Sequence, residues 1–92
     1  MATLRISRPH ALPPAEARAR VARAASRIEQ RFGADCEWQG DVLVIRHASV
    51  NGTVTVAVAE VVVEARLGLA LSLARGRAEA EITRILDREL AP

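Results

Sequence analysis

The sequence predicts an α+β domain, a two-layer sandwich in which two helices cover one face of an antiparallel meander sheet. Two segments of the 92-residue chain repeat apolar residues every three or four positions, which indicates amphipathic helices. Between these segments apolar and polar residues alternate, which indicates strands with one buried face. The expected order is β-α-β-β-β-β-α, and the length suits one domain, 1–92.

The first strand is expected at Thr3–Ser7, where two apolar residues share one face. The first helix is expected at Ala15–Phe32, because its apolar residues form a single stripe. Pro14 suits the first turn of this helix, and Gly33 suits a left-handed cap at its end. The stripe consists of Ala17, Val21, Ala24, Ile28 and Phe32.

Three two-residue turns predict the register of the remaining four strands. They are expected at Gly40-Asp41, Asn51-Gly52 and Ala59-Glu60. The resulting cross-strand pairs are Trp38 with Leu43, Ile45 with Val58, and Val58 with Val61. Together the turns place the apolar residues of all four strands on one face, which a one-residue slip would destroy.

The last helix is expected at Arg77–Leu90, where apolar residues again recur at helical spacing. Before it, eight uncharged residues lie between Arg66 and Arg75, and leucine alternates there with glycine, alanine and serine. The alternation suits a strand and the composition suits a helix. We favour a short helical turn, because a strand running from Val61 to Leu73 would be unusually long.

The leucines of this segment form the first candidate contact surface. Leu69, Leu71 and Leu73 must be buried or must meet another apolar surface. Residues four apart share a helix face, so we expect Leu69 and Leu73 against the sheet and Leu71 more exposed. The sequence leaves open whether residues 67–74 belong to the core or to an adhesion surface.

A line of arginines along the first helix forms the second candidate surface. Its members are Arg20, Arg23, Arg27 and Arg31. Such a line suits a contact with phosphates, anionic lipid or an acidic protein; alternatively it is a solvated flank whose aliphatic stems cover the core edge. The net charge of +2 and the scarcity of aromatic residues argue against nucleic acid as the partner.

The sequence contains no recognisable catalytic or metal-binding pattern, so we expect a protein that is not an enzyme and has no cofactor or metal. Cys36 and His47 fall on neighbouring strands without facing each other. We interpret Cys36 as a small core residue and His47 as a partly buried residue with a local hydrogen bond. His10, in a proline-bounded connector, either orients that loop or contacts a ligand.

Short pieces along nearly the whole chain match one known family in order. They include Ile6 through His10, Arg31-Phe32-Gly33, Trp38-Gln39-Gly40-Asp41, Leu67-Gly68, Arg75-Gly76 and Glu81-Ile82. On these pieces the chain resembles the small proteobacterial family of polyhydroxyalkanoic acid system proteins. Arg77 stands where family members often carry proline. The resemblance implies an association with the genes for polyhydroxyalkanoate storage granules, and it supplies no catalytic residues.

Three functions are consistent with these observations. The first is a non-enzymatic accessory protein that binds the granule surface or a granule protein. The second is a protein that binds a small apolar ligand or an acyl chain in a cavity between sheet and helix. The third is a nucleic-acid-binding regulator of the same genes. A homodimer through the outer sheet face, which carries Val42, Val44, Ala57 and Val62, is a further hypothesis.

The location expected for the chain follows from segments that it lacks. It has no apolar signal core near Met1 and no apolar run long enough to span a bilayer. We therefore expect a cytoplasmic protein, at the granule surface if it binds there.

Overall fold

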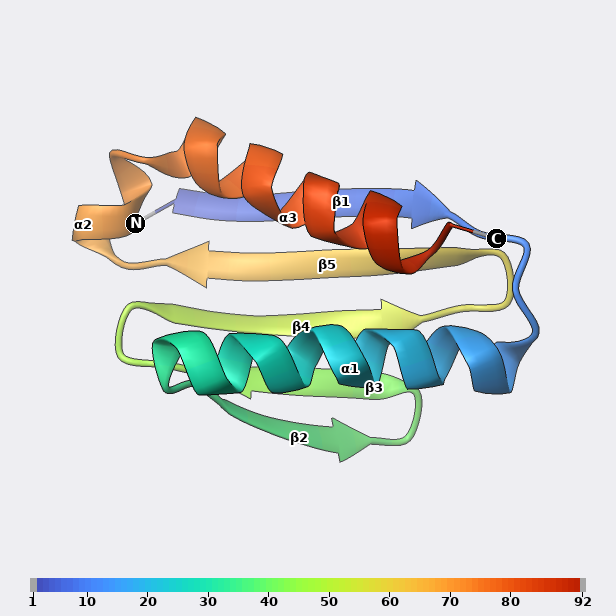
Figure 1. The fold of residues 1–92 in the computed structure, drawn as a ribbon. Helices are drawn as coiled ribbons and strands as arrows, with labels where there is room; N and C mark the ends of the chain where they lie inside the picture. Colours follow the sequence, from blue (N-terminus) through green and yellow to red (C-terminus); the bar gives the residue numbers. More distant parts are fainter. Residues whose placement is uncertain (1, 92) are drawn as a thin grey trace.

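The computed structural model describes residues 2–91, without the side chains of Ala2, Arg31, Phe32, Ala70 and Leu71. Its elements are β1 (Ala2–Pro9), α1 (Pro14–Phe32), β2 (Asp35–Gln39), β3 (Val42–Arg46), β4 (Val50–Val56), β5 (Glu60–Leu67), α2 (Leu69–Ser72) and α3 (Arg75–Glu89). The antiparallel sheet has the strand order β1-β5-β4-β3-β2. Helices α1 and α3 cover one of its faces, which confirms the predicted sandwich (Figure 1).

The ends of α1 follow the signals in the sequence. Pro14 occupies the first turn, where its missing N–H group has no helical partner to lose. Gly33 adopts the left-handed conformation with φ 71°, and its N–H group donates to the Glu29 carbonyl oxygen at 2.9 Å. Helix α3 begins two residues earlier than predicted, at Arg75, and therefore includes Gly76.

The register of the first hairpin is confirmed, but the predicted turn at Asn51-Gly52 is wrong. Trp38 pairs with Leu43 as expected, whereas Asn51 and Gly52 lie inside β4 and Gly52 pairs with Ile45. The turn forms earlier, where the Ser49 N–H group donates to His47 Nδ1 at 3.1 Å. Gly52 serves a different need: a Cβ atom there would lie 2.7 Å from the Glu64 carbonyl oxygen on β5.

The predicted turn at Ala59-Glu60 is wrong by one residue. The Ala57 N–H group donates to the Glu60 carbonyl oxygen at 2.9 Å, so Val58 and Ala59 form the tip of the turn. Val61 consequently pairs with Val56 rather than Val58. The partner of Val61 thus moves by two residues, from Val58 to Val56, and the partner of Ile45 moves by six, from Val58 to Gly52. Both shifts are even, so every side chain stays on the face of the sheet that was predicted for it.

The core lies between the sheet and the two helices. Its most deeply buried members come from β3 and β5, and the strands β1 and β4 and both long helices add the rest. The buried cluster is Leu4, Ile6, Val21, Ala25, Leu43, Val54, Val61, Val63, Ala65, Leu67, Leu86 and Leu90. Trp38 lies on the predicted face of the sheet but is only half-buried. The Arg18 guanidinium lies over its indole ring, with the guanidinium carbon 4.3 Å from the ring centre.

Candidate functional site

The leucine segment forms the predicted helical turn, α2, but its exposure differs from the prediction. Leu69 is 79% exposed and Leu73 is 92% exposed, so the expectation that both pack against the sheet is wrong. The side chain of Leu71 lies outside the described residues. Leu67, the last residue of β5, does enter the core, at 2% exposure.

The position of α2 explains why Leu69 and Leu73 stay in solvent. The Gly68 N–H group donates to the Ser49 carbonyl oxygen at 2.8 Å, which anchors the start of α2 to the loop between β3 and β4. Figure 1 shows that α2 lies at the end of the sheet where β5 ends. Because the sheet does not continue beneath it, Leu69 and Leu73 have no strand surface to cover. Two large apolar side chains therefore form an exposed patch, which we call the leucine patch.

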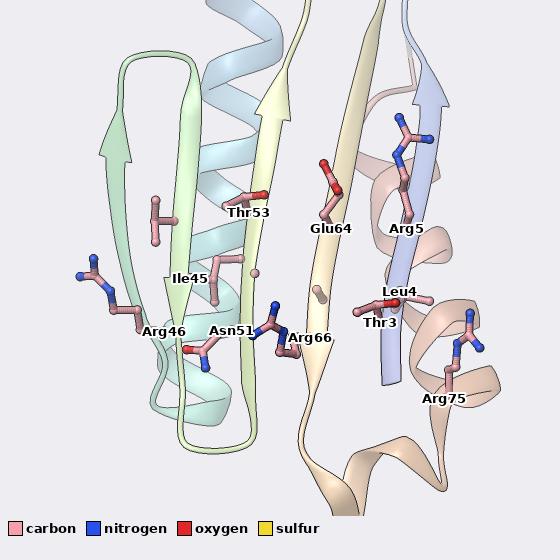
Figure 2. A pocket seen from close by; sticks show the side chains of 13 residues that line it. Thr3, Leu4, Arg5, Ile45, Arg46, Asn51, Thr53, Glu64, Arg66 and Arg75 are labelled. Carbon is pink, nitrogen blue, oxygen red and sulfur yellow. The ribbon is translucent and has the colours of Figure 1, made fainter. Parts of the chain in front are cut away.

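Beside the leucine patch, the uncovered face of the sheet carries a basic hollow of about 770 Å³. Arg5 on β1, Arg46 on β3, Arg66 on β5 and Arg75 at the start of α3 line it, and all four side chains are exposed (Figure 2). We call this group the arginine hollow. Asn51 pairs with both Arg46 and Arg66, so these three residues form one row across the sheet.

The arginine hollow was not predicted from the sequence. Its members come from four elements, and the wrong register at Asn51-Gly52 separated Arg46 from Arg66. One signal was visible: Arg66 and Arg75 bracket the leucine segment. That bracketing places basic charge at both ends of any exposed α2.

The arginine line of α1 contacts the C-terminal helix. Arg27 Nη1 lies 3.2 Å from the Glu89 carboxylate, which is buried to 9% exposure. Arg20 pairs with Glu16 at 3.0 Å and donates to the backbone carbonyl oxygens of Glu89 and Ala91. These contacts give two of the four arginines a role in holding α1 against α3. The side chain of Arg31 lies outside the described residues, and partner binding by the line stays a prediction.

We expect charge reversal at Arg27 to destabilise the domain and charge reversal at Arg23 to leave it unchanged. Arg27→Glu removes the cation beside the buried Glu89 carboxylate and adds a second anion. An unpaired buried acceptor costs about 1–3 kcal/mol in free energy of unfolding. Arg23 is exposed and makes no side-chain hydrogen bond or ion pair with the described residues, so Arg23→Glu should cost less than about 0.5 kcal/mol. Urea denaturation of both variants measures the difference, and equal midpoints would contradict it.

Cys36 and His47 have the structural surroundings that the sequence predicts. Burial raises the pKa of the Cys36 thiol, and the Glu29 and Asp35 carboxylates raise it further, so the thiol stays protonated and is a weak nucleophile at neutral pH. His47 makes the expected local hydrogen bond to Ser49.

His10 orients the connector between β1 and α1, which is the first of the two roles considered for it from the sequence. Its Nδ1 atom accepts a hydrogen bond from the Leu12 N–H group at 3.2 Å. The proton therefore lies on Nε2, which donates to the Ala57 carbonyl oxygen at 2.9 Å. These bonds, with the one from the His10 N–H group to the Ala59 carbonyl oxygen, hold the connector against the β4–β5 turn.

Two observations bear on whether the domain could hold a metal ion or enclose an apolar ligand. Among residues 2–91 with described side chains, no three histidine, cysteine or acidic residues are grouped so that they could hold a metal ion. The hollow between α1 and α3 measures about 170 Å³ and has charged residues at its rim, including Arg84, Arg88 and Glu81. Sites that enclose apolar ligands occupy about 300–1,000 Å³, so this hollow gives the acyl-chain hypothesis no support.

Within the described part of the chain, every helix is too short or too polar to cross a membrane.

Comparison with protein families gives one match over most of the chain. The model of a family described as "putative polyhydroxyalkanoic acid system protein" matches residues 4–90. This range contains every strand and helix except the first two residues of β1. Comparisons with curated proteins and with solved structures found no match.

Proposed function

Because the chain belongs to the family of polyhydroxyalkanoic acid system proteins, we propose that it is a non-enzymatic accessory protein that binds the surface of polyhydroxyalkanoate granules in the cytoplasm. The leucine patch is the observation that carries this proposal. Leu69 and Leu73 are exposed at 79% and 92%, beside a Leu67 that is fully buried. A polyester surface is apolar, and it offers these side chains the burial that the fold does not provide.

The size of the contact is sufficient for adsorption. Burying one leucine side chain contributes about 1.5–3 kcal/mol. Leu69 at the start of α2 and Leu73 in the turn that follows it can insert together without ordering a flexible segment, because α2 is hydrogen-bonded to Ser49 through Gly68 and contacts α3. Among the side chains that the structure describes, the opposite end of the domain presents only one large exposed apolar group, Val58, on a tight turn. We therefore assign the granule contact to the α2 end.

Co-sedimentation of the full chain with polyester granules tests the proposal. The wild-type chain should pellet with granules, and Leu69→Glu with Leu73→Glu should abolish pelleting, because two carboxylates would have to leave water. Val58→Glu is the matched control: Val58 is 80% exposed but lies at the other end of the sheet, so this variant should pellet like the wild type. Circular dichroism should show that all three chains are folded. Pelleting of the double variant, or loss of pelleting by Val58→Glu alone, would contradict the assignment.

A homodimer through the outer sheet face is a second proposal, and one observation favours it. No helix covers this face, and Val42 and Val44 lie half-buried there beside the buried Val62. Sedimentation equilibrium of the wild type and of Val44→Glu tests the homodimer. A monomeric wild type would exclude it.

A further inference from the structure

The arginine hollow concentrates positive charge that the fold does not neutralise. The side chains of Arg5, Arg66 and Arg75 make no hydrogen bond or ion pair with the described residues. Arg46 contacts only the exposed Glu37 carboxylate, at 3.4 Å. Glu64 is the one carboxylate in the lining of the hollow. Three of four guanidinium groups are thus free to bind an external anion.

The start of α3 adds to this positive field. Ala74 provides no side-chain cap, and the first turn contains no acidic residue. Arg75 and Arg77 stand there instead, although positive charge is unfavourable at the N-terminus of a helix. An anion held by Arg75 would compensate both the side-chain charge and the helix dipole.

The arginine hollow and the leucine patch lie at the same end of the molecule. Arg66 is three residues before Leu69, and Arg75 is two residues after Leu73. Arg46 is the last residue of β3, at the end of the sheet that adjoins α2, and Arg5 lies farther along β1, opposite Glu64 of β5. Figure 2 shows Arg66 and Arg75 on either side of the chain segment that carries α2. A partner that covers this end must therefore present apolar groups and anions together.

We propose that this end of the domain docks on a lipid layer with anionic phosphate headgroups, into which the leucine patch inserts. Exposed apolar residues flanked by arginine are the pattern of interfacial binding. Guanidinium groups match phosphate oxygens in geometry, and each basic residue near an anionic layer strengthens binding. Free phosphate would not use Leu69 and Leu73, and nucleic acid would leave them in water. This inference rests on the proposed function and identifies what coats the granule surface that the protein meets.

Vesicle sedimentation tests the inference. The wild-type chain should bind vesicles of phosphatidylglycerol and phosphatidylcholine, bind pure phosphatidylcholine far more weakly, and lose affinity as salt rises. Each arginine contributes about fivefold, so Arg66→Gln with Arg75→Gln should weaken binding to the anionic vesicles about 25-fold. Arg23→Gln with Arg88→Gln is the matched control, because it removes the same charge from exposed, unpaired positions on α1 and α3. This control should bind the anionic vesicles like the wild type.

A second arm separates this inference from the proposed function. Lipid-free polyester particles should bind the hollow variant as well as the wild type, because the leucines are intact. Equal wild-type binding to both vesicle types, or hollow and control variants that bind anionic vesicles alike, would overturn the lipid contact even if polyester binding persists. Arginine-dependent binding of inorganic phosphate without vesicle binding would also overturn it. If the wild-type chain binds anionic vesicles but does not bind lipid-free polyester particles, the proposed function is contradicted and the lipid contact is supported.

Discussion

Leu67→Ala should destabilise the domain by about 2–5 kcal/mol, whereas Leu69→Ala should change the free energy of unfolding by less than about 0.5 kcal/mol. The two leucines are two positions apart in the chain. Leu67 is 2% exposed at the end of β5 and belongs to the core cluster, and Leu69 is 79% exposed on α2. Truncating Leu67 leaves a cavity between sheet and helix, and truncating Leu69 removes only surface that water already reaches.

Urea denaturation followed by circular dichroism measures this difference. The midpoint should fall steeply for Leu67→Ala and stay near the wild-type value for Leu69→Ala, with the same slope in all three chains. A large loss of stability for Leu69→Ala would mean that α2 packs into the core. Such a result would remove the leucine patch as a contact surface.

Gly52→Ala should cost about 1–3 kcal/mol, which is the range for overpacking a tight site. A Cβ atom at this position would lie 2.7 Å from the Glu64 carbonyl oxygen and 3.3 Å from the Ala65 side chain, so β4 and β5 must separate. Both of these atoms belong to β5, which is held between β1 and β4 and cannot shift without disturbing its pairing with both strands. The substitution should therefore weaken the part of the sheet that positions Arg66.

Gly76→Ala is the matched control for Gly52→Ala. Gly76 lies in α3 with no atom near its would-be Cβ, and alanine favours the helix. This variant should gain about 0.5–1 kcal/mol. Thermal denaturation of the two variants compares them directly. If both substitutions change the stability in the same direction, the close approach at Gly52 does not limit strand packing.

The sequence predicted the helices and the faces of the strands because both depend on local periodicity. Ala17, Val21 and Ala24 of the α1 stripe are buried as predicted, the side chain of Phe32 lies outside the described residues, and the cap at Gly33 is confirmed. The pairing of Trp38 with Leu43 is also confirmed. The Asn51-Gly52 turn failed because the same dipeptide serves another purpose, the close approach of β4 to β5. The faces survived because period-two alternation tolerates any even shift in register.

Exposure at α2 could not be predicted, because it depends on where the sheet ends. The usual length of a strand correctly indicated a helical turn after Leu67, but the expected burial of Leu69 and Leu73 assumed that a sheet surface continued under them. Predicting the arginine hollow required the correct strand register as well. Its arginines come together only when β1, β3, β4 and β5 pair as they do in the structure. Contacts between residues far apart in the chain decided both features.

The orientation of the domain on polyester particles tests the central claim most directly. An environment-sensitive fluorophore is attached to cysteine in Leu73→Cys or in Val58→Cys, each with Cys36→Ala to remove the native thiol. Both positions are exposed in the free protein, at opposite ends of the sheet. On binding to the particles, the emission of the probe at position 73 should shift to the blue, and that of the probe at position 58 should stay unchanged. A shift at position 58 with none at position 73 would contradict the assignment of the leucine patch as the granule contact.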